Sequence, residues 1–138
     1  MPVLMDTSVL AAFLNPRDEN HARAKGLMRE VMLGGHGTPI SSDAVLAEGL
    51  TLLRRRPGRR DVSTRFAGIF AADGVLAPIV RLRRATAEEL DRAVAFHFSH
   101  YDRQLSITDC LLLGLAADMS APIASFDEGF DGLVERLR

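Results

Sequence analysis

Residues 105–133 read LSITDCLLLGLAADMSAPIASFDEGFDGL, and this stretch is the most informative about the fold. Ser106 and Asp109 have the spacing of a capping box, which opens a helix that we expect to run to about Met119. Pro122–Ser125 then reads as a short apolar strand, which Asp127 closes. A helix is thus followed directly by a strand.

The same alternation of short strands and helices extends over the rest of the chain. Further strands are expected at Pro2–Met5, Thr38–Ile40, Val75–Leu82 (with Pro78 suggesting an edge position) and Val134–Leu137. Further helices are expected at Thr7–Leu14, Asn20–Leu33, from the Ser41–Asp43 cap to about Arg55, at Asp61–Ala72 and from Thr86 to about His100. This order predicts an α/β fold with a largely parallel sheet.

The composition is that of a globular protein with one domain, residues 1–138, in which 47% of residues are hydrophobic and 25% charged. A single cysteine, Cys110, excludes an internal disulfide, and a reducing cytoplasm is the simplest location. The net charge of −1 excludes a globally basic nucleic-acid binder but not a local basic patch. We find no signal peptide and no apolar run near the roughly 18 residues of a membrane span, so we expect a soluble protein with no membrane partner.

Four carboxylates occupy unusual positions in this pattern. Asp6 and Asp127 each close a strand, and ligands of parallel sheets bind outside the carboxyl ends of strands. Asp109 lies in the first turn of its helix, and Glu48 lies at the edge of an apolar helix face, half-buried or facing a cleft. Each alone is explained by a cap, a turn or an ion pair. Together they would repel one another and raise their own pKa values unless a cation lay between them.

The chemistry of this set suggests a hard metal ion. All four side chains offer oxygen ligands, and no Cys/His set with zinc spacing is present. Oxygen ligation suits Mg²⁺ or Mn²⁺, which can generate a nucleophilic hydroxide and stabilise charge on a phosphoryl group. The residues therefore indicate a possible metal-dependent phosphodiester enzyme.

The segments MDTSVLAAFLN (residues 5–15) and 105–133, with Glu48 between them, resemble the PIN-domain ribonucleases and in particular the VapC-type toxins of type II toxin–antitoxin systems. The resemblance covers essentially the whole chain. It implies a three-layer α/β/α sandwich with a short, largely parallel central sheet, and an acidic pocket that binds Mg²⁺ or Mn²⁺ and cleaves RNA. It also implies a cognate antitoxin protein and a homodimer.

Carried over by position, the family's acidic set corresponds to Asp6, Glu48, Asp109 and Asp127. Asp6, Asp109 and Asp127 would hold one or two ions, and Glu48 would ligate a second ion or orient the attacking water. Two supporting polar residues also correspond: Ser8, and Ser125, whose hydroxyl could bind a metal-bound water. Asp131 is an additional acid, which Gly129 and Phe130 could direct away from the pocket.

Two other features have both a structural and a functional interpretation. Five arginines crowd into residues 54–60, either as a solvated loop or as a contact for the RNA backbone beside the acidic pocket: Arg54, Arg55, Arg56, Arg59 and Arg60. Phe66, Ile69 and Phe70 form an apolar stripe at helical spacing, which is either core or part of a dimer or antitoxin interface.

Two alternative functions remain at this point. A catalytically inactive PIN-like module would bind RNA or protein without hydrolysis, although the complete acidic set argues against it. A phosphatase of the haloacid dehalogenase type would need a second Asp two residues after Asp6, where this chain has Ser8.

Overall fold

Five parallel strands form the centre of the molecule in the computed structural model, which describes residues 1–55, 60–71 and 78–138. The order across the sheet is β3-β2-β1-β4-β5, and all four strand pairs are parallel. The strands span β1 Pro2–Met5, β2 Thr38–Ser42, β3 Arg81–Arg83, β4 Ile123–Ala124 and β5 Arg136–Leu137.

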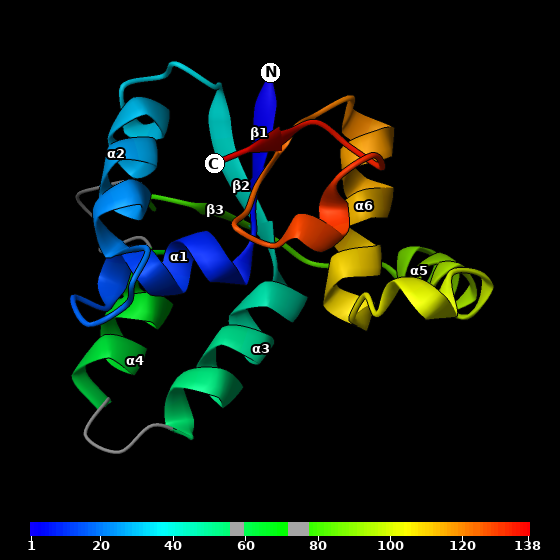
Figure 1. Ribbon diagram of the computed structural model, residues 1–138, viewed down its shortest axis with the longest axis horizontal. Coiled ribbons are helices and arrows are strands. Elements are labelled where there is room, and N and C mark those ends of the chain that lie inside the picture. Colours follow the sequence, from blue (N-terminus) through cyan, green and yellow to red (C-terminus); the bar gives the residue numbers. More distant parts are fainter. Residues whose placement is uncertain (56–59, 72–77) are drawn as a thin grey trace.

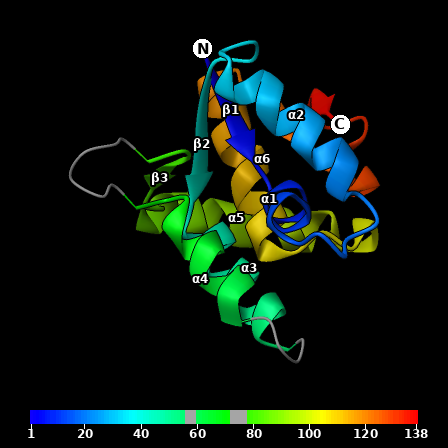
Figure 2. The same cartoon turned by 90° about the vertical axis from the view of Figure 1, so that its left-hand side faces the viewer.

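Helices lie on both sides of this sheet. They span α1 Thr7–Leu14, α2 His21–Met32, α3 Asp43–Arg54, α4 Arg60–Gly68, α5 Ala87–Ser99 and α6 Ile107–Met119, with short 3₁₀ turns η1 Tyr101–Arg103 and η2 Glu128–Phe130. Helices α1 and α2 lie on one side of β1 and β2, while α5 and α6 lie on the other (Figures 1 and 2). The predicted α/β class with a parallel central sheet is confirmed. None of the helices in the described ranges has both the length and the apolar character needed to cross a bilayer.

The core explains the apolar runs of the sequence. Val3, Leu4 and Met5 are fully buried, as expected for a central parallel strand that is covered on both faces. Helix α6 is apolar nearly all round because it packs between the sheet and α5, so both of its sides are covered.

The Phe66–Phe70 stripe belongs to this core. Phe66 is fully buried, and Ile69 and Phe70 are also buried, so the stripe is no surface for a dimer or an antitoxin. A Cβ atom at Gly49 would lie 2.1 Å from Cζ of Phe66, so glycine at this position lets α4 pack tightly against α3.

Two expected elements differ from those observed. The expected strand Val75–Leu82 overlaps residues 72–77, which lie outside the described residues, and the observed strand β3 begins only at Arg81. It is an edge strand, as Pro78 suggested. The expected helix Asp61–Ala72 ends early, at Gly68. The backbone N–H groups of Phe70 and Ala71 donate to carbonyls three residues back, and the Ile69 carbonyl accepts from Val80 N, so the α-helical hydrogen bonds stop here.

The strand order creates the site. From β1 the chain adds β2 and β3 on one side and later adds β4 and β5 on the other. Because β1 and β4 are neighbours, the residues after Met5 and Ala124 meet at the carboxyl edge of the sheet. Such a reversal of strand order is where open parallel sheets form their binding crevices.

Candidate active site

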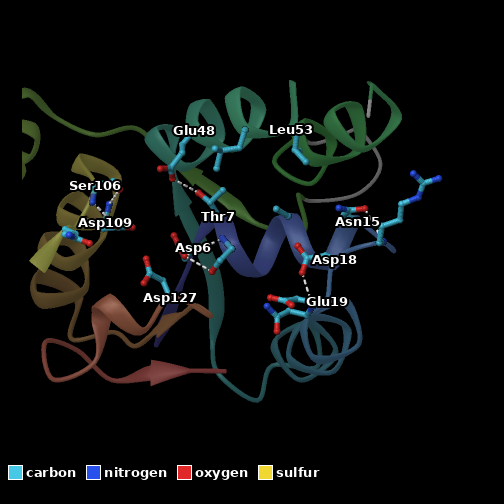
Figure 3. A pocket seen from close by; sticks show the side chains of 16 residues that line it. Asp6, Thr7, Asn15, Asp18, Glu19, Glu48, Leu53, Ser106, Asp109 and Asp127 are labelled. Carbon is cyan, nitrogen blue, oxygen red and sulfur yellow. Dashed lines mark hydrogen bonds between the residues drawn. The ribbon is translucent and has the colours of Figure 1, made fainter. Parts of the chain in front are cut away.

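A pocket of about 650 Å³ lies at this edge of the sheet. All four predicted carboxylates line it, and each comes from a different part of the fold: Asp6 between β1 and α1, Glu48 from α3, Asp109 from α6 and Asp127 after β4 (Figure 3). The expectation that Asp6 and Asp127 face one crevice holds because their strands are neighbours.

Asp6 is the most firmly held of the four. It caps α1, and its Oδ2 accepts hydrogen bonds from Ser8 Oγ at 2.7 Å and from Ser125 Oγ at 2.8 Å. The other oxygen, Oδ1, takes no part in these serine hydrogen bonds, and Asp6 lines the pocket. One oxygen is thus used to orient the carboxylate, and the other can bind a ligand.

Ser8 and Ser125 are the two supporting polar residues, and the structure shows what they support. Ser125 is fully buried beneath Asp6 and does not line the pocket, so its hydroxyl orients the carboxylate rather than reaching a bound water. Its oxygen also accepts from Asp127 N at 2.9 Å, and Ser8 Oγ accepts from Phe126 N at 3.0 Å. The two hydroxyls therefore tie the start of α1 to the segment that carries Asp127.

Glu48 is half-buried and lines the pocket, in agreement with its position at the edge of the apolar face of α3. Thr7 Oγ1 donates to Glu48 Oε2 at 2.9 Å, which connects the first residue of α1 to the middle of α3 (Figure 3). Thr7 had no assigned role in the sequence. Only the packing of α1 against α3 brings it to Glu48.

Asp109 is held by the predicted capping box. Its Oδ2 accepts from Ser106 N at 2.8 Å, and its own N–H donates to Ser106 Oγ at 3.0 Å. The structural and functional interpretations of Asp109 are therefore compatible, because the capping carboxylate also lines the pocket.

Asp131 is directed away from the carboxylates. It pairs with Arg136, whose Nε lies 2.6 Å from Oδ1, and this guanidinium lowers the pKa of Asp131. Arg136 Nη1 also donates to the Ser125 carbonyl at 3.2 Å. Asp131 thus stabilises the loop after β4 instead of joining the acidic set.

The acidic set carries the electrostatic strain expected of crowded carboxylates. Burial raises the pKa of Asp109 to about 6, and the nearby charges of Asp6 and Asp127 add to the shift. Burial, with the charges of Asp6 and Asp127, also raises the pKa of Glu48. The pKa of Asp6 is raised by burial against the opposing effect of its serine hydrogen bonds. A cation in the pocket would lower all three pKa values, because it favours the charged carboxylates.

The arginine run is only partly described. Arg56 and Arg59 lie outside the described residues, and Arg54, Arg55 and Arg60 are exposed. Arg54 and Arg55 line a second, shallow hollow with Ser63 of α4, not the acidic pocket. The basic residue that does line the acidic pocket is Arg17, in the turn between α1 and α2, beside the buried Asn15. The sequence marked Asn15 and Pro16 only as a helix end.

The donor set fits a hard divalent ion. Its ligand atoms are all carboxylate oxygens, and the raised pKa values show that the pocket favours added positive charge. Across residues 1–55, 60–71 and 78–138, no group of three or more His, Cys, Asp or Glu side chains is arranged so that it could hold a metal ion by itself. Mg²⁺ does not need such a group, because it keeps several waters and is usually held by one or two carboxylates.

Comparison with known proteins gives a consistent family. The model of the PIN domain matches residues 3–135, and no curated protein sequence matches the chain. The chain is similar to the solved structure of VapC20 of Mycobacterium tuberculosis, described as a sarcin–ricin loop cleaving toxin, with 27% identity, a TM-score of 0.74 and coverage of 94% of this chain and 91% of that one.

Two more distant structures share the fold. VapBC2 of Rickettsia felis, solved with a DNA fragment from its promoter, has 13% identity and a TM-score of 0.67, with 99% and 98% of the chains covered. FitAcB of Neisseria gonorrhoeae has 15% identity and a TM-score of 0.65, with 99% and 96% covered.

Proposed function

The chain belongs to the PIN domain family, and on this basis we propose that it is a ribonuclease toxin that hydrolyses RNA phosphodiester bonds with Mg²⁺ or Mn²⁺. One observation supports this most strongly: four carboxylates from separate elements line one pocket at the carboxyl edge of the sheet. The resemblance to the VapC-type toxins, over 94% of the chain for VapC20, supports the toxin assignment.

In this proposal Asp6, Asp109 and Asp127 hold the metal. Oδ1 of Asp6 would be the ligand atom, since Ser8 and Ser125 hold Oδ2. The bound ion would supply positive charge for the developing phosphoryl oxygens and lower the pKa of a bound water.

Glu48 then acts as the proton acceptor. Thr7 holds its Oε2, which leaves Oε1 to accept a proton from the attacking water. Glu48 lines the same pocket as the three proposed metal ligands, which places a carboxylate beside the water that it would deprotonate. As the water oxygen bonds to phosphorus, the bond to the leaving ribose oxygen breaks, and that oxygen takes a proton from solvent.

The substrate and partners are part of the same proposal. Because VapC20 is described as cleaving the sarcin–ricin loop, we take an RNA stem-loop as the first substrate to assay. We also propose a cognate antitoxin, a homodimer and a cytoplasmic location, but the Phe66–Phe70 stripe is not the dimer interface because it is core.

The family match removes the haloacid dehalogenase phosphatase from the alternatives. It does not separate an active enzyme from an inactive PIN-like binding module. The complete acidic set in one pocket favours the enzyme.

A nuclease assay tests the proposal. End-labelled RNA is incubated with the purified chain in Mn²⁺, in Mg²⁺ and in chelator, beside Glu48→Gln as the matched variant. We expect metal-dependent fragments from the wild type, and a rate lower by about 10²–10⁴-fold in the variant, the usual contribution of a general base. Equal fragment yields from both proteins would contradict the role of Glu48, and no fragments from the wild type in either metal would contradict the enzyme.

A further inference from the structure

The acidic pocket extends well beyond its carboxylates. It continues along α1 to the α1–α2 turn, where Asn15, Asp18 and Glu19 lie at the opposite end from Asp109 and Asp127 (Figure 3). Thr7 and Asn15 are eight residues apart, or about 12 Å along a helix axis. This outer end is thus too far away to share a metal ion with the four carboxylates.

Asn15 is a buried residue whose side-chain amide lines this outer end. The residue is only 2% exposed, and its Oδ1 accepts from Arg17 N at 3.2 Å. That bond identifies the oxygen, so the NH₂ group is the other end of the amide. Nδ2 donates to no described residue. Because the described part contains no buried side-chain N or O atom without a partner, Nδ2 is not sealed from solvent, and Asn15 lines the pocket. A ligand acceptor at this point would satisfy it.

The surroundings of Asn15 suit a flat heterocycle. Ala11 and Leu53 line the pocket nearby, together with Leu52, which is 47% exposed although it is apolar. An apolar wall beside polar groups is how proteins bind a base that is not stacked in a duplex. Arg17 adds further donors, while Asp18 and Glu19 add acceptors and disfavour a phosphate.

We propose that the outer end of the pocket is a subsite that selects a guanine base of the bound RNA, with Asn15 Nδ2 donating to guanine O6 or N7. Guanine presents two adjacent acceptors on one edge and an amino group on another. The same end of the pocket offers the donors of Asn15 and Arg17 for the first edge and the carboxylates of Asp18 and Glu19 for the amino group. Adenine places an amino group next to N7 and so offers the donors only one acceptor. The inference rests on the proposed function only in taking RNA as the ligand.

A binding experiment tests the subsite without cleavage. Uridine hexanucleotides with one central guanosine or one central adenosine are titrated into the protein in chelator. For the wild type we expect about fivefold tighter binding of the guanosine hexamer, the selectivity of one added hydrogen bond. Asn15→Asp keeps the oxygen that accepts from Arg17 N but loses the donor, so the ratio should fall to about one.

Two controls make the result specific. The two hexamers carry equal charge, so the carboxylate added by Asn15→Asp weakens the binding of both equally and leaves the ratio of their affinities unaffected. The chain has only three side-chain amides, Asn15, Asn20 and Gln104, so their NH₂ signals are readily assigned by NMR. The Asn15 signal should shift with the guanosine hexamer and much less with the adenosine hexamer.

Equal binding of both hexamers by the wild type, or an unchanged ratio in Asn15→Asp, would overturn the subsite. So would the absence of binding to either hexamer. These failures are separate from that of the proposed function. A wild type that cleaves RNA in Mn²⁺ without guanine selectivity refutes the subsite alone. Guanine-selective binding without cleavage in metal refutes the enzyme but leaves the subsite standing.

Discussion

Replacing Asp109 by Asn should stabilise the metal-free protein while it disables the site. The pKa of Asp109 is raised from its ordinary 3.8 to about 6. A shift of about two units corresponds to about 3 kcal/mol between the two protonation states. Because the folded state disfavours the charged form, the free energy of unfolding falls as pH rises from about 4 to about 6, and the full penalty remains above pH 6.

The substitution removes this penalty but little else. The amide side chain of the variant would keep an oxygen to accept from Ser106 N, so the helix cap largely survives. At pH 8 in chelator we therefore expect the variant to be more stable by about 1–3 kcal/mol, or roughly 3–10 °C in Tm for a domain of this size. The difference should shrink toward pH 4, where the wild-type carboxyl is also neutral.

Metal should reverse the order of thermal stability of the wild type and the Asp109→Asn variant. Mn²⁺ relieves the carboxylate repulsion and binds the folded state, so it should raise the Tm of the wild type much more than that of the variant. RNA cleavage by the variant should fall by orders of magnitude. Thermal melts at pH 5 and pH 8, each with chelator and with Mn²⁺, and a cleavage time course measure all of these effects.

Asp118→Asn is the matched control, because it makes the same change on the same helix. Asp118 is exposed and pairs with Arg92, so its loss should cost at most about 1 kcal/mol and leave cleavage and the Mn²⁺ effect unchanged. The reasoning is refuted if Asp109→Asn melts below the wild type at pH 8 in chelator, or if it turns over RNA at the wild-type rate.

Three further predictions concern packing, RNA contacts and assembly. Gly49→Ala should destabilise the fold by about 1–3 kcal/mol in denaturant melts, because the new methyl overlaps the Phe66 ring; an unchanged midpoint would contradict that packing. If Arg54 and Arg55 contact phosphates, replacing both by Ala should reduce the slope of log affinity against log salt by about 0.7 per contact for single-stranded RNA, and an unchanged slope would make them solvated side chains. Sedimentation at micromolar concentration should show a homodimer, whereas a monomer would contradict the assembly that the family resemblance implies.

Local signals in the sequence predicted most of the secondary structure. The capping box of α6 is present as expected and α5 begins after Thr86 as expected, because the hydrogen bonds of both helix starts join residues three apart. The bounds of α1 and β1 also agree with those expected. The predicted end of α4 was wrong, because the backbone after Gly68 is held by Val80, whose N–H donates to the carbonyl of Ile69 eleven residues earlier.

The types of residue that form the site could also be predicted from the sequence, but their arrangement in space could not. Residue type and position predicted four oxygen ligands, and the two strand ends predicted a shared crevice for Asp6 and Asp127. That the crevice exists follows from the adjacency of β1 and β4, which is a property of the strand order. Likewise, Asp131 is excluded from it by Arg136, a partner that no spacing rule indicated.

The sequence by itself determined the order of helices and strands, the helix caps and the carboxylate chemistry, because these depend on residue type and on hydrogen bonds within a few residues. Only the tertiary structure decided that Phe66 is core, that Thr7 holds Glu48 and that Asn15 lines the pocket. These contacts join residues far apart in the chain or depend on what packs around a turn. Their free energy arises only when the sheet and its helices are assembled, so no local pattern encodes them.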